Sequence, residues 1–276
     1  MNGIRKKEVL APDIVRLRLE APRIAARREP GQFVILRRID GSERIPLTIV
    51  DGNAEEGWID LIIQMAGAGT MRLGRLEEGE GVLDLVGPLG KPSRIDRFGR
   101  CLCIGGGVGL APLLPIARAL KAAGNHLTVL MGARNRERLI LLDEMRNLAD
   151  EITVATEDGS LGRRGFVSDA FRDLASEGRR FDHAVVIGPA VMMKAVSELT
   201  GRLGIPTTVS LNPIMIDGTG LCGGCRVDVG GEMKFACVDG PEFDAARIDW
   251  DSFLKRLGSY REFEHRGREK CRITGR

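Results

Sequence analysis

The sequence predicts an N-terminal antiparallel β barrel, then a doubly wound parallel α/β domain, then a small cysteine-rich C-terminal segment. Residues 4–87 alternate in short strand-like runs separated by turns. From about residue 99 to residue 211, apolar strands alternate with helical stretches. Three cysteines then follow among closely spaced glycines. We therefore expect four units: 1–98, 99–211, 212–245, and a C-terminal helix and basic tail over 246–276.

The composition is that of an ordinary globular protein. The 276 residues carry a formal net charge of +3, with 43% hydrophobic and 29% charged residues. So small a charge does not indicate a nucleic-acid surface. The N-terminus lacks the continuous apolar stretch of a signal peptide, and no segment approaches the roughly 18 apolar residues of a membrane span. We expect a cytoplasmic protein that binds neither nucleic acid nor membrane.

Five short runs predict the strands of the barrel. Glycine, proline or acidic turns separate these runs, and their spacing is typical of a small antiparallel barrel. The runs are residues 13–20, 32–38, 46–50, 58–65 and 81–87.

Alternating strands and helices predict the second domain, because strands joined by helices pair in parallel. The expected strands are 101–106, 126–133, 151–158, 183–189 and 207–211. The expected helices are 110–124, 138–149, 167–178 and 190–204. Residues 248–263 indicate one further helix, and we expect the basic tail REKCRITGR to be disordered.

The turn GGGVGLAP, residues 105–112, joins the first strand of this domain to its first helix. Backbone N–H groups at such a turn can hold a phosphate, and glycines let a ligand approach closely. The match to the dinucleotide-binding motif G-x-G-x-x-G is imperfect, because Leu110 replaces the third glycine. The second strand ends in MGARN, so it also lacks the acidic residue that would bind the ribose. A tight turn without a ligand is the alternative. Turns at 132–134, 156–160 and 188–193 lie at the same sheet edge, which favours a nucleotide there.

The order of these elements resembles the ferredoxin reductase superfamily over roughly residues 1–211. The run VSLNPIMIDGTGLCGGCRV further resembles electron-transfer subunits that append an iron–sulfur segment. These subunits are of the NADH-dependent reduced ferredoxin:NADP oxidoreductase type or the dihydroorotate dehydrogenase type. The phrases RIPLTI, DGTGLCGGCRV and FACVDGPEFD favour the first type. The resemblance implies FAD on the barrel, NAD(H) on the sheet and a [2Fe–2S] cluster.

The resemblance also implies which residues bind the two nucleotides. For FAD they are Arg44, Pro46, Leu47, Thr48, Gly67, Gly69 and Thr70. For the dinucleotide they are Gly105, Gly106, Gly107, Gly109, Pro112, Gly188 and Pro189. One departure is that Arg44 lies four residues before Thr48, whereas the family places its arginine three residues before the hydroxyl.

The choice of nicotinamide cofactor depends on the turn TEDGS. Glu157 and Asp158 stand where NADP-binding relatives carry serine and arginine. Carboxylates there would repel a 2′-phosphate and accept hydrogen bonds from a free ribose diol, which favours NAD(H) over NADP(H). Arg163 and Arg164 lie close by in sequence and count against this interpretation.

The cysteine segment reads D-x4-C-x2-C-x11-C. Plant-type two-iron clusters use C-x4-C-x2-C with a distant fourth cysteine, and Asp217 stands in the first position. We expect the ligands Asp217, Cys222, Cys225 and Cys237, with Cys271 the next residue to consider. Nearby glycines allow a tight loop around a cluster. A structural zinc site and incidental cysteines are the alternatives.

We therefore expect an oxidoreductase subunit that moves electrons between NAD(H), FAD and a [2Fe–2S] cluster. The resemblance implies a larger flavoprotein and iron–sulfur partner subunit, with ferredoxin as an indirect partner. No acid–base residue is nominated, because hydride transfer needs positioning and not a proton donor. The alternatives are a dihydroorotate dehydrogenase subunit, a flavin reductase acting alone and a zinc-bearing interaction module.

Overall fold

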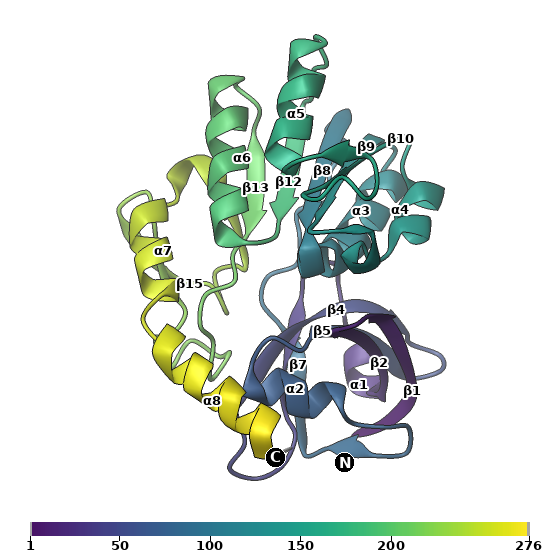
Figure 1. Cartoon of the computed structure of the whole chain (residues 1–276), viewed down its shortest axis with the longest axis vertical. Coiled ribbons are helices and arrows are strands. Elements are labelled where there is room, and N and C mark those ends of the chain that lie inside the picture. Colours follow the sequence, from purple (N-terminus) through teal and green to yellow (C-terminus); the bar gives the residue numbers. More distant parts are fainter. Residues whose placement is uncertain (1, 275–276) are drawn as a thin grey trace.

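The computed structural model describes residues 2–274 and confirms the predicted fold class (Figure 1). The barrel is a seven-stranded sheet in the order β6-β1-β2-β5-β4-β3-β7. Leu83 alone separates β6 from β7, so the sheet is nearly closed. Its strands are β1 (Asn2–Ala11), β2 (Ile14–Glu20), β3 (Phe33–Arg37), β4 (Ile45–Asn53), β5 (Trp58–Gln64), β6 (Gly81–Val82) and β7 (Asp84–Leu89). Two short helices, α1 (Pro22–Ala25) and α2 (Ala68–Gly74), accompany them.

The strand β1 was not expected, and the reason lies in its side chains. Its sequence NGIRKKEVLA is largely polar, and only Ile4 and Ala11 are buried. Antiparallel pairing with β2 and β6 forms this strand, and that pairing depends on backbone groups rather than on an apolar pattern.

The second domain is a seven-stranded sheet in the order β11-β10-β9-β8-β12-β13-β16. All pairs are parallel except β13 with β16. The strands are β8 (Arg100–Gly106), β9 (His126–Ala133), β10 (Glu151–Thr156), β11 (Arg163–Arg164), β12 (His183–Ile187), β13 (Thr207–Ser210) and β16 (Glu242–Asp244). The chain order reverses at β8, which lies between β9 and β12, and ligands of doubly wound sheets bind at such a switch point.

Helices cover both faces of this sheet, and each face has its own apolar core (Figure 1). On one face lie α3 (Leu110–Ala122) and α4 (Leu142–Leu148), and on the other lie α5 (Val167–Ser176) and α6 (Ala190–Arg202). The expected helix 138–149 is shorter, because Leu141 adopts a φ of 60° directly before α4.

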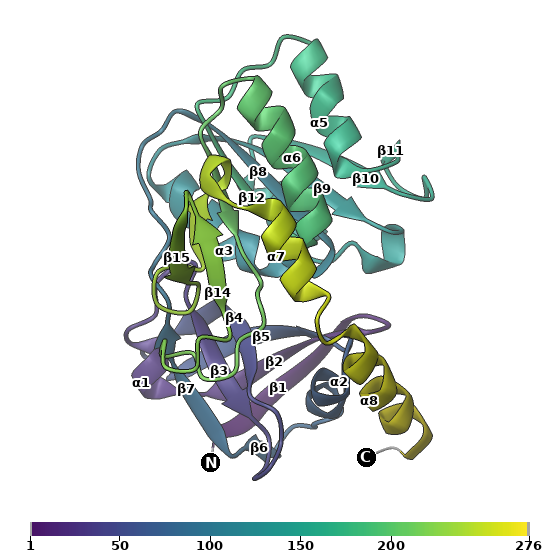
Figure 2. The same cartoon turned by 90° about the vertical axis from the view of Figure 1, so that its left-hand side faces the viewer.

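The C-terminal segment contains the hairpin β14 (Arg226–Val229) and β15 (Glu232–Phe235), then α7 (Trp250–Leu257) and α8 (Arg261–Thr274). Two expectations were wrong: the single helix 248–263 is two helices, and the basic tail is helical up to Thr274. Figure 2 shows α8 lying beside α2 of the barrel. The tail is therefore ordered by contact with a helix nearly 200 positions earlier in the sequence. Arg75, directly after α2, and Cys271 on α8 are one such pair. Within residues 2–274, no helix is long and apolar enough to cross a membrane.

Candidate functional site

The glycine turn lies at the switch point of the parallel sheet, between the end of β8 and the start of α3. A Cβ added at Gly109 would lie 2.5 Å from the carbonyl oxygen of Ile187 and 2.7 Å from Cα of Gly188. A Cβ added at Gly107 would meet nothing within 4 Å, and the residue has a φ of +56°. Gly109 therefore permits packing against the turn after β12, whereas Gly107 borders open space that a ligand can enter.

The residues expected for the dinucleotide come together at this edge. A Cβ at Gly106 would lie 3.2 Å from Cδ of Pro189, and a Cβ at Gly188 would lie 3.2 Å from Cα of Gly106. Gly105 lies one residue before the end of β8, and a Cβ there would lie 2.5 Å from Cδ2 of Leu110. Pro112 lies in the first turn of α3, where proline is tolerated. The two glycine turns thus form one wall at the carboxyl ends of β8 and β12.

Glu157 and Asp158 follow β10 at the same edge and are exposed. Oδ1 of Asp158 accepts hydrogen bonds from the Ser160 hydroxyl (2.6 Å) and amide (2.9 Å), and these bonds lower the pKa of the Asp158 carboxyl. Arg163 donates to Asp173 and lies 3.8 Å from Asp169. Arg163 is therefore already neutralised, which removes one of the two arginines that counted against NAD(H).

The residues expected for FAD also adjoin one another. Pro46, Leu47 and Thr48 lie on β4, and Gly67 and Gly69 lie at the start of α2. The hydroxyl of Thr70 bonds to the amide (2.9 Å) and the carbonyl (3.0 Å) of Gly67, which shapes this start. A Cβ at Gly69 would lie 2.8 Å from Cδ1 of Ile45, so β4 and α2 approach closely.

Arg44, which the resemblance assigns to FAD, also acts electrostatically on the cysteine loop. It is exposed in the turn before β4. Its charge contributes to lowering the pKa of the Asp217 carboxyl, after the larger effect of hydrogen bonds from Thr219. Arg44 therefore lies near the cysteine loop, which links the expected flavin segment to the expected cluster ligands.

The cysteine loop packs directly on the barrel. A Cβ at Gly218, which has a φ of +82°, would lie 2.7 Å from Cγ1 of Ile35 in β3 and 2.9 Å from Cδ1 of Leu89 in β7. One small buried core joins the two units, and it contains Phe33, Ile35, Met215, Cys225, Ala236 and Cys237. The sequence carried no signal for this contact, because alternation in β3 indicates burial but not the partner.

The four expected cluster ligands fall into two pairs. The Sγ atoms of Cys225 and Cys237 lie 3.2 Å apart in the buried core, where burial raises the pKa of the Cys237 thiol to about 12. Cys222 is exposed, and its sulfur accepts a hydrogen bond from the Gly224 amide (3.4 Å). This bond and one from the Asp217 amide lower the pKa of the Cys222 thiol. The Asp217 carboxylate accepts from the amides of Thr219 (3.0 Å) and Leu221 (3.4 Å).

The donor set of three thiols and one carboxylate suits a two-iron cluster, which takes two ligands for each iron. Within residues 2–274, no three His, Cys, Asp or Glu side chains gather closely enough to hold one metal ion. Gly218, Gly220 and Gly223 have positive φ angles, so the loop has the backbone conformations that wrapping a cluster requires.

The remaining cysteines lie away from this loop. Cys101 and Cys103 are buried in β8, as expected for core residues, and burial raises the pKa of Cys101 to about 11. Cys271 is buried on α8, with its sulfur 3.9 Å from the carbonyl oxygen of Ala68 and 4.0 Å from Nη1 of Arg75. Cys271 thus contacts α2 of the barrel, so its position does not favour it as a fourth ligand.

Glu242 is a half-buried carboxyl that no sequence pattern indicates. Glu242 on β16 accepts a hydrogen bond from the Ser93 hydroxyl (2.5 Å), and burial raises its pKa to about 7. A Cβ at Gly31 would lie 2.1 Å from Oγ of Ser93. Glu242 therefore lies where the barrel, the connection between the domains and the last strand of the second sheet meet. Only that convergence buries it, so no local pattern could have found it.

Two family models match the chain. The model of the iron-sulfur cluster binding domain of dihydroorotate dehydrogenase B matches residues 212–249, a range that contains Asp217, Cys222, Cys225 and Cys237. The model of the oxidoreductase NAD-binding domain matches residues 103–198, which contain the glycine turn.

Known proteins resemble the chain over nearly its whole length. A Thermotoga maritima protein, the dihydroorotate dehydrogenase B (NAD(+)) electron transfer subunit homolog, is 48% identical over 96% of this chain and 93% of its own. A probable subunit of the same name from Methanopyrus kandleri is 35% identical, with 87% of each covered. A solved structure of NADH-dependent reduced ferredoxin–NADP oxidoreductase matches with 47% identity and a TM-score of 0.92, covering 98% and 97% of the two chains. Phthalate dioxygenase reductase, 19% identical with a TM-score of 0.63 over 83% and 85%, shares the fold.

Proposed function

The chain belongs to the family of dihydroorotate dehydrogenase B electron-transfer subunits and their homologues, and on this premise we propose that it is the electron-transfer subunit of a flavin and iron–sulfur oxidoreductase. It moves electrons between NAD(H), FAD and a [2Fe–2S] cluster, to or from a larger flavoprotein and iron–sulfur partner subunit. The partner is of the NADH-dependent reduced ferredoxin:NADP oxidoreductase type, so ferredoxin is an indirect partner. The 47% identity over almost the full length of both chains supports this type.

The observation that carries the proposal is the core shared by β3 and the cysteine loop. Electron transfer between a flavin and a cluster requires that their binding segments be held close together and rigidly. Ile35 and Gly218 meet without room for a Cβ, which supports a fixed distance between the barrel and the loop. A metal-bearing module without redox function would not need this contact with the barrel.

The residues divide into three binding sets. The barrel segment (1–98) holds FAD through β4 and the start of α2, at the residues expected from the sequence. The α/β segment (99–211) holds NAD(H) at the two glycine turns, with Glu157 and Asp158 toward the ribose. The loop segment (212–245) holds the cluster through Asp217, Cys222, Cys225 and Cys237, and the helices α7 and α8 follow it.

The protein contributes positioning rather than acid–base chemistry. When bound, a flavin supplies the means to exchange electrons either as a pair or singly. Gly107 leaves room for the dinucleotide to approach the sheet, and Gly109 lets the turn pack against Ile187. Thr48 lies on β4, on the barrel side of the site. Amides of Gly224 and Asp217 facing the Cys222 sulfur stabilise its thiolate form. We assign the protein to the cytoplasm, since free thiols persist as metal ligands in a reducing compartment.

The test is the purified, anaerobically reconstituted full chain. We expect bound FAD, two iron atoms per chain within about 20% of a [2Fe–2S] stoichiometry, and flavin absorption that bleaches on adding NADH. A colourless preparation that contains zinc and no flavin would show that the chain is an interaction module instead.

A dihydroorotate dehydrogenase subunit is the second candidate, because the family model matched over residues 212–249 is the one for that enzyme. Purifying the native complex through this chain separates the two. A complex that reduces NAD(+) with dihydroorotate would support the second candidate, whereas NADP(H)- and ferredoxin-dependent activity supports the first.

A further inference from the structure

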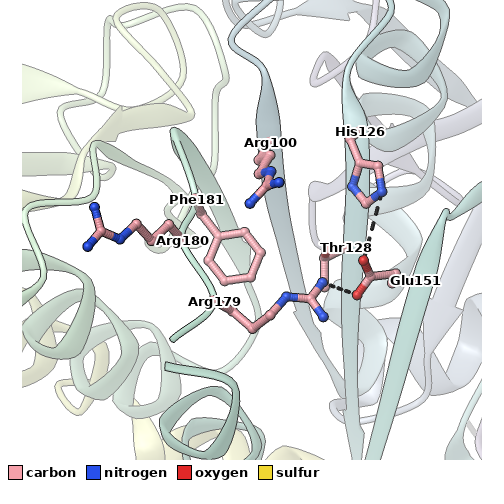
Figure 3. Close-up of a pocket in the computed structure, with 7 residues that line it drawn as sticks. All are labelled: Arg100, His126, Thr128, Glu151, Arg179, Arg180 and Phe181. Atoms are coloured by element: carbon pink, nitrogen blue, oxygen red, sulfur yellow. Dashed lines mark hydrogen bonds and ion pairs between the residues drawn. The ribbon is translucent and has the colours of Figure 1, made fainter. Parts of the chain in front are cut away.

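Figure 3 shows a cavity of about 200 Å³ and the side chains that line it. It lies at the amino edge of the parallel sheet, at the other end of the strands from the glycine turns. Residues at the amino ends of three strands form its floor: Arg100 begins β8, His126 and Thr128 are the first and third residues of β9, and Glu151 begins β10. The connection from α5 to β12 covers it with Arg179 and Phe181. Since β8 and β9 run in parallel from this edge to the glycine turn, the cavity is separated from that turn by the length of the strands.

All the strand residues of the cavity lie on one face of the sheet. Arg100 pairs with His126, and Thr128 pairs with Glu151, so their side chains are in register. Side chains alternate along a strand, and the next residues on this face, Leu102 and Leu130, belong to the core beneath α5 and α6. The cavity is therefore the polar end of that core, with Phe181 as the boundary.

The charges around the cavity are not balanced. Arg179 forms an ion pair with Glu151, and Nε2 of His126 lies 3.8 Å from Oε1 of the same carboxylate. Within residues 2–274, the guanidinium of Arg100 makes no hydrogen bond or ion pair, and in Figure 3 it points into the cavity. Two guanidinium groups thus face the cavity against one carboxylate, and a positive charge remains for an anion.

Thr128 adds a neutral donor at the same cavity. The residue is 2% exposed, and within residues 2–274 its hydroxyl has no hydrogen-bond partner. The hydroxyl oxygen is not one of the fully buried atoms without a partner, so it reaches the cavity and can donate a hydrogen bond to a ligand there. An acceptor oxygen in the cavity would satisfy it.

We propose that this cavity binds a small phosphate-type oxyanion, either inorganic phosphate or the phosphate group of a small monoester. Guanidinium groups bind phosphate through directed, charge-assisted hydrogen bonds, and the Thr128 hydroxyl adds a neutral donor. The volume is below the roughly 300–1,000 Å³ of sites for larger organic ligands, so a dinucleotide does not fit. The site is distinct from the one proposed for NAD(H).

The test is calorimetric titration of the full chain with inorganic phosphate at constant ionic strength, with NADH saturating so that the glycine turn is occupied. We expect saturable binding of phosphate. Arg100→Gln should weaken it at least about tenfold, and Thr128→Val about threefold, in line with a charged and a neutral hydrogen bond. Arg180→Gln is the matched control, because Arg180 borders the same cavity but points away from it in Figure 3.

The outcomes are decisive in both directions. A parallel titration with ribose 5-phosphate identifies the source: tighter binding than phosphate supports a monoester, and weaker binding supports free phosphate. The proposal is wrong if wild type shows no saturable heat with either ligand, if binding disappears when NADH is present, or if Arg180→Gln weakens binding as much as Arg100→Gln. Circular dichroism of each variant shows whether the fold is retained.

Discussion

The sulfur atoms of Cys225 and Cys237 lie 3.2 Å apart inside a core that also contains Ile35 of the barrel. The other two expected ligands, the half-buried Asp217 and the exposed Cys222, lie outside this core in the same loop. One pair of ligands is therefore held by apolar packing, and the other by backbone amides and glycine-rich turns. This division guides the predictions for the cluster.

Replacing Asp217 tests the unusual ligand. Asp217→Ala should lose iron about as severely as Cys222→Ala, because each change leaves one iron short of a ligand. Asp217→Cys should retain a two-iron cluster, since it restores the plant-type spacing. Iron analysis and electron paramagnetic resonance of the dithionite-reduced variants measure this. Cys271→Ala is the control, and an Asp217→Ala protein with full iron and an unchanged signal would place the fourth ligand elsewhere.

Enlarging Gly218 tests the contact between loop and barrel. Gly218→Ala should lower cluster content by about half or more while flavin content is unchanged, because its Cβ would overlap Ile35, 2.7 Å away. Gly223→Ala is the matched control: its φ is also positive (+64°), but its Cβ would lie 3.7 Å from Phe235. The iron-to-flavin ratio of the two variants is the measurement, and equal ratios would mean that the contact with Ile35 is unimportant.

The two glycines of the turn should behave differently. Gly107→Asn fills open space, and asparagine tolerates the left-handed conformation at +56°. We expect NADH-dependent flavin reduction to fall at least about tenfold, with flavin content unchanged. Gly204→Asn, at a φ of +67° with nothing within 4 Å, is the control. Gly109→Val should instead impair folding, because its Cβ would meet the backbone of Ile187. Normal reduction by NADH in Gly107→Asn would refute the placement.

Cofactor choice should follow the carboxylates after β10. Reduction should be more efficient with NADH than with NADPH by about tenfold, which corresponds to about 1.4 kcal/mol of differential binding. Glu157→Gln should reduce the preference for NADH over NADPH. Asp158 is less suitable for this test, because it also accepts a hydrogen bond from Ser160, so replacing it would disturb the turn as well. Stopped-flow reduction of the flavin by each nucleotide measures the ratio. Equal rates in wild type would mean that these side chains do not face the ribose.

Glu242 should make stability depend on pH. Burial raises the pKa of its carboxyl from 4.5 to about 7, so between these values it is protonated in the folded chain and ionised in the unfolded chain. Its stabilising contribution is therefore complete below pH 4.5 and is lost as the pH rises to about 7. Glu242→Gln should raise the free energy of unfolding by about 1–2 kcal/mol at pH 8 and change it little at pH 4.5. The urea midpoints of wild type and variant at both pH values are the measurement. If the substitution shifted the midpoint equally at both, titration of the Glu242 carboxyl would not be the cause.

The sequence by itself determined the elements that depend on local patterns. Alternating apolar residues predicted β2 to β5 and β8 to β10, and the run 105–112 predicted the turn between β8 and α3. Side-chain periodicity and glycine content carry this information, because they express which face of an element is buried and which backbone angles are possible. The spacing of Asp217 and the three loop cysteines likewise predicted a candidate cluster site.

Only the tertiary structure decided how these elements meet. The polar strand β1 and the charged helix α8 form because β2 and α2 lie beside them, not because of their own patterns. The roles of Gly107 and Gly109 separate only when Ile187 is placed against the turn. The docking of the cysteine loop on Ile35, the burial of Glu242 and the cavity at Arg100 all join residues far apart in the chain. Their energies come from close packing and from removing charge from water, and both depend on the neighbours that the folded chain supplies.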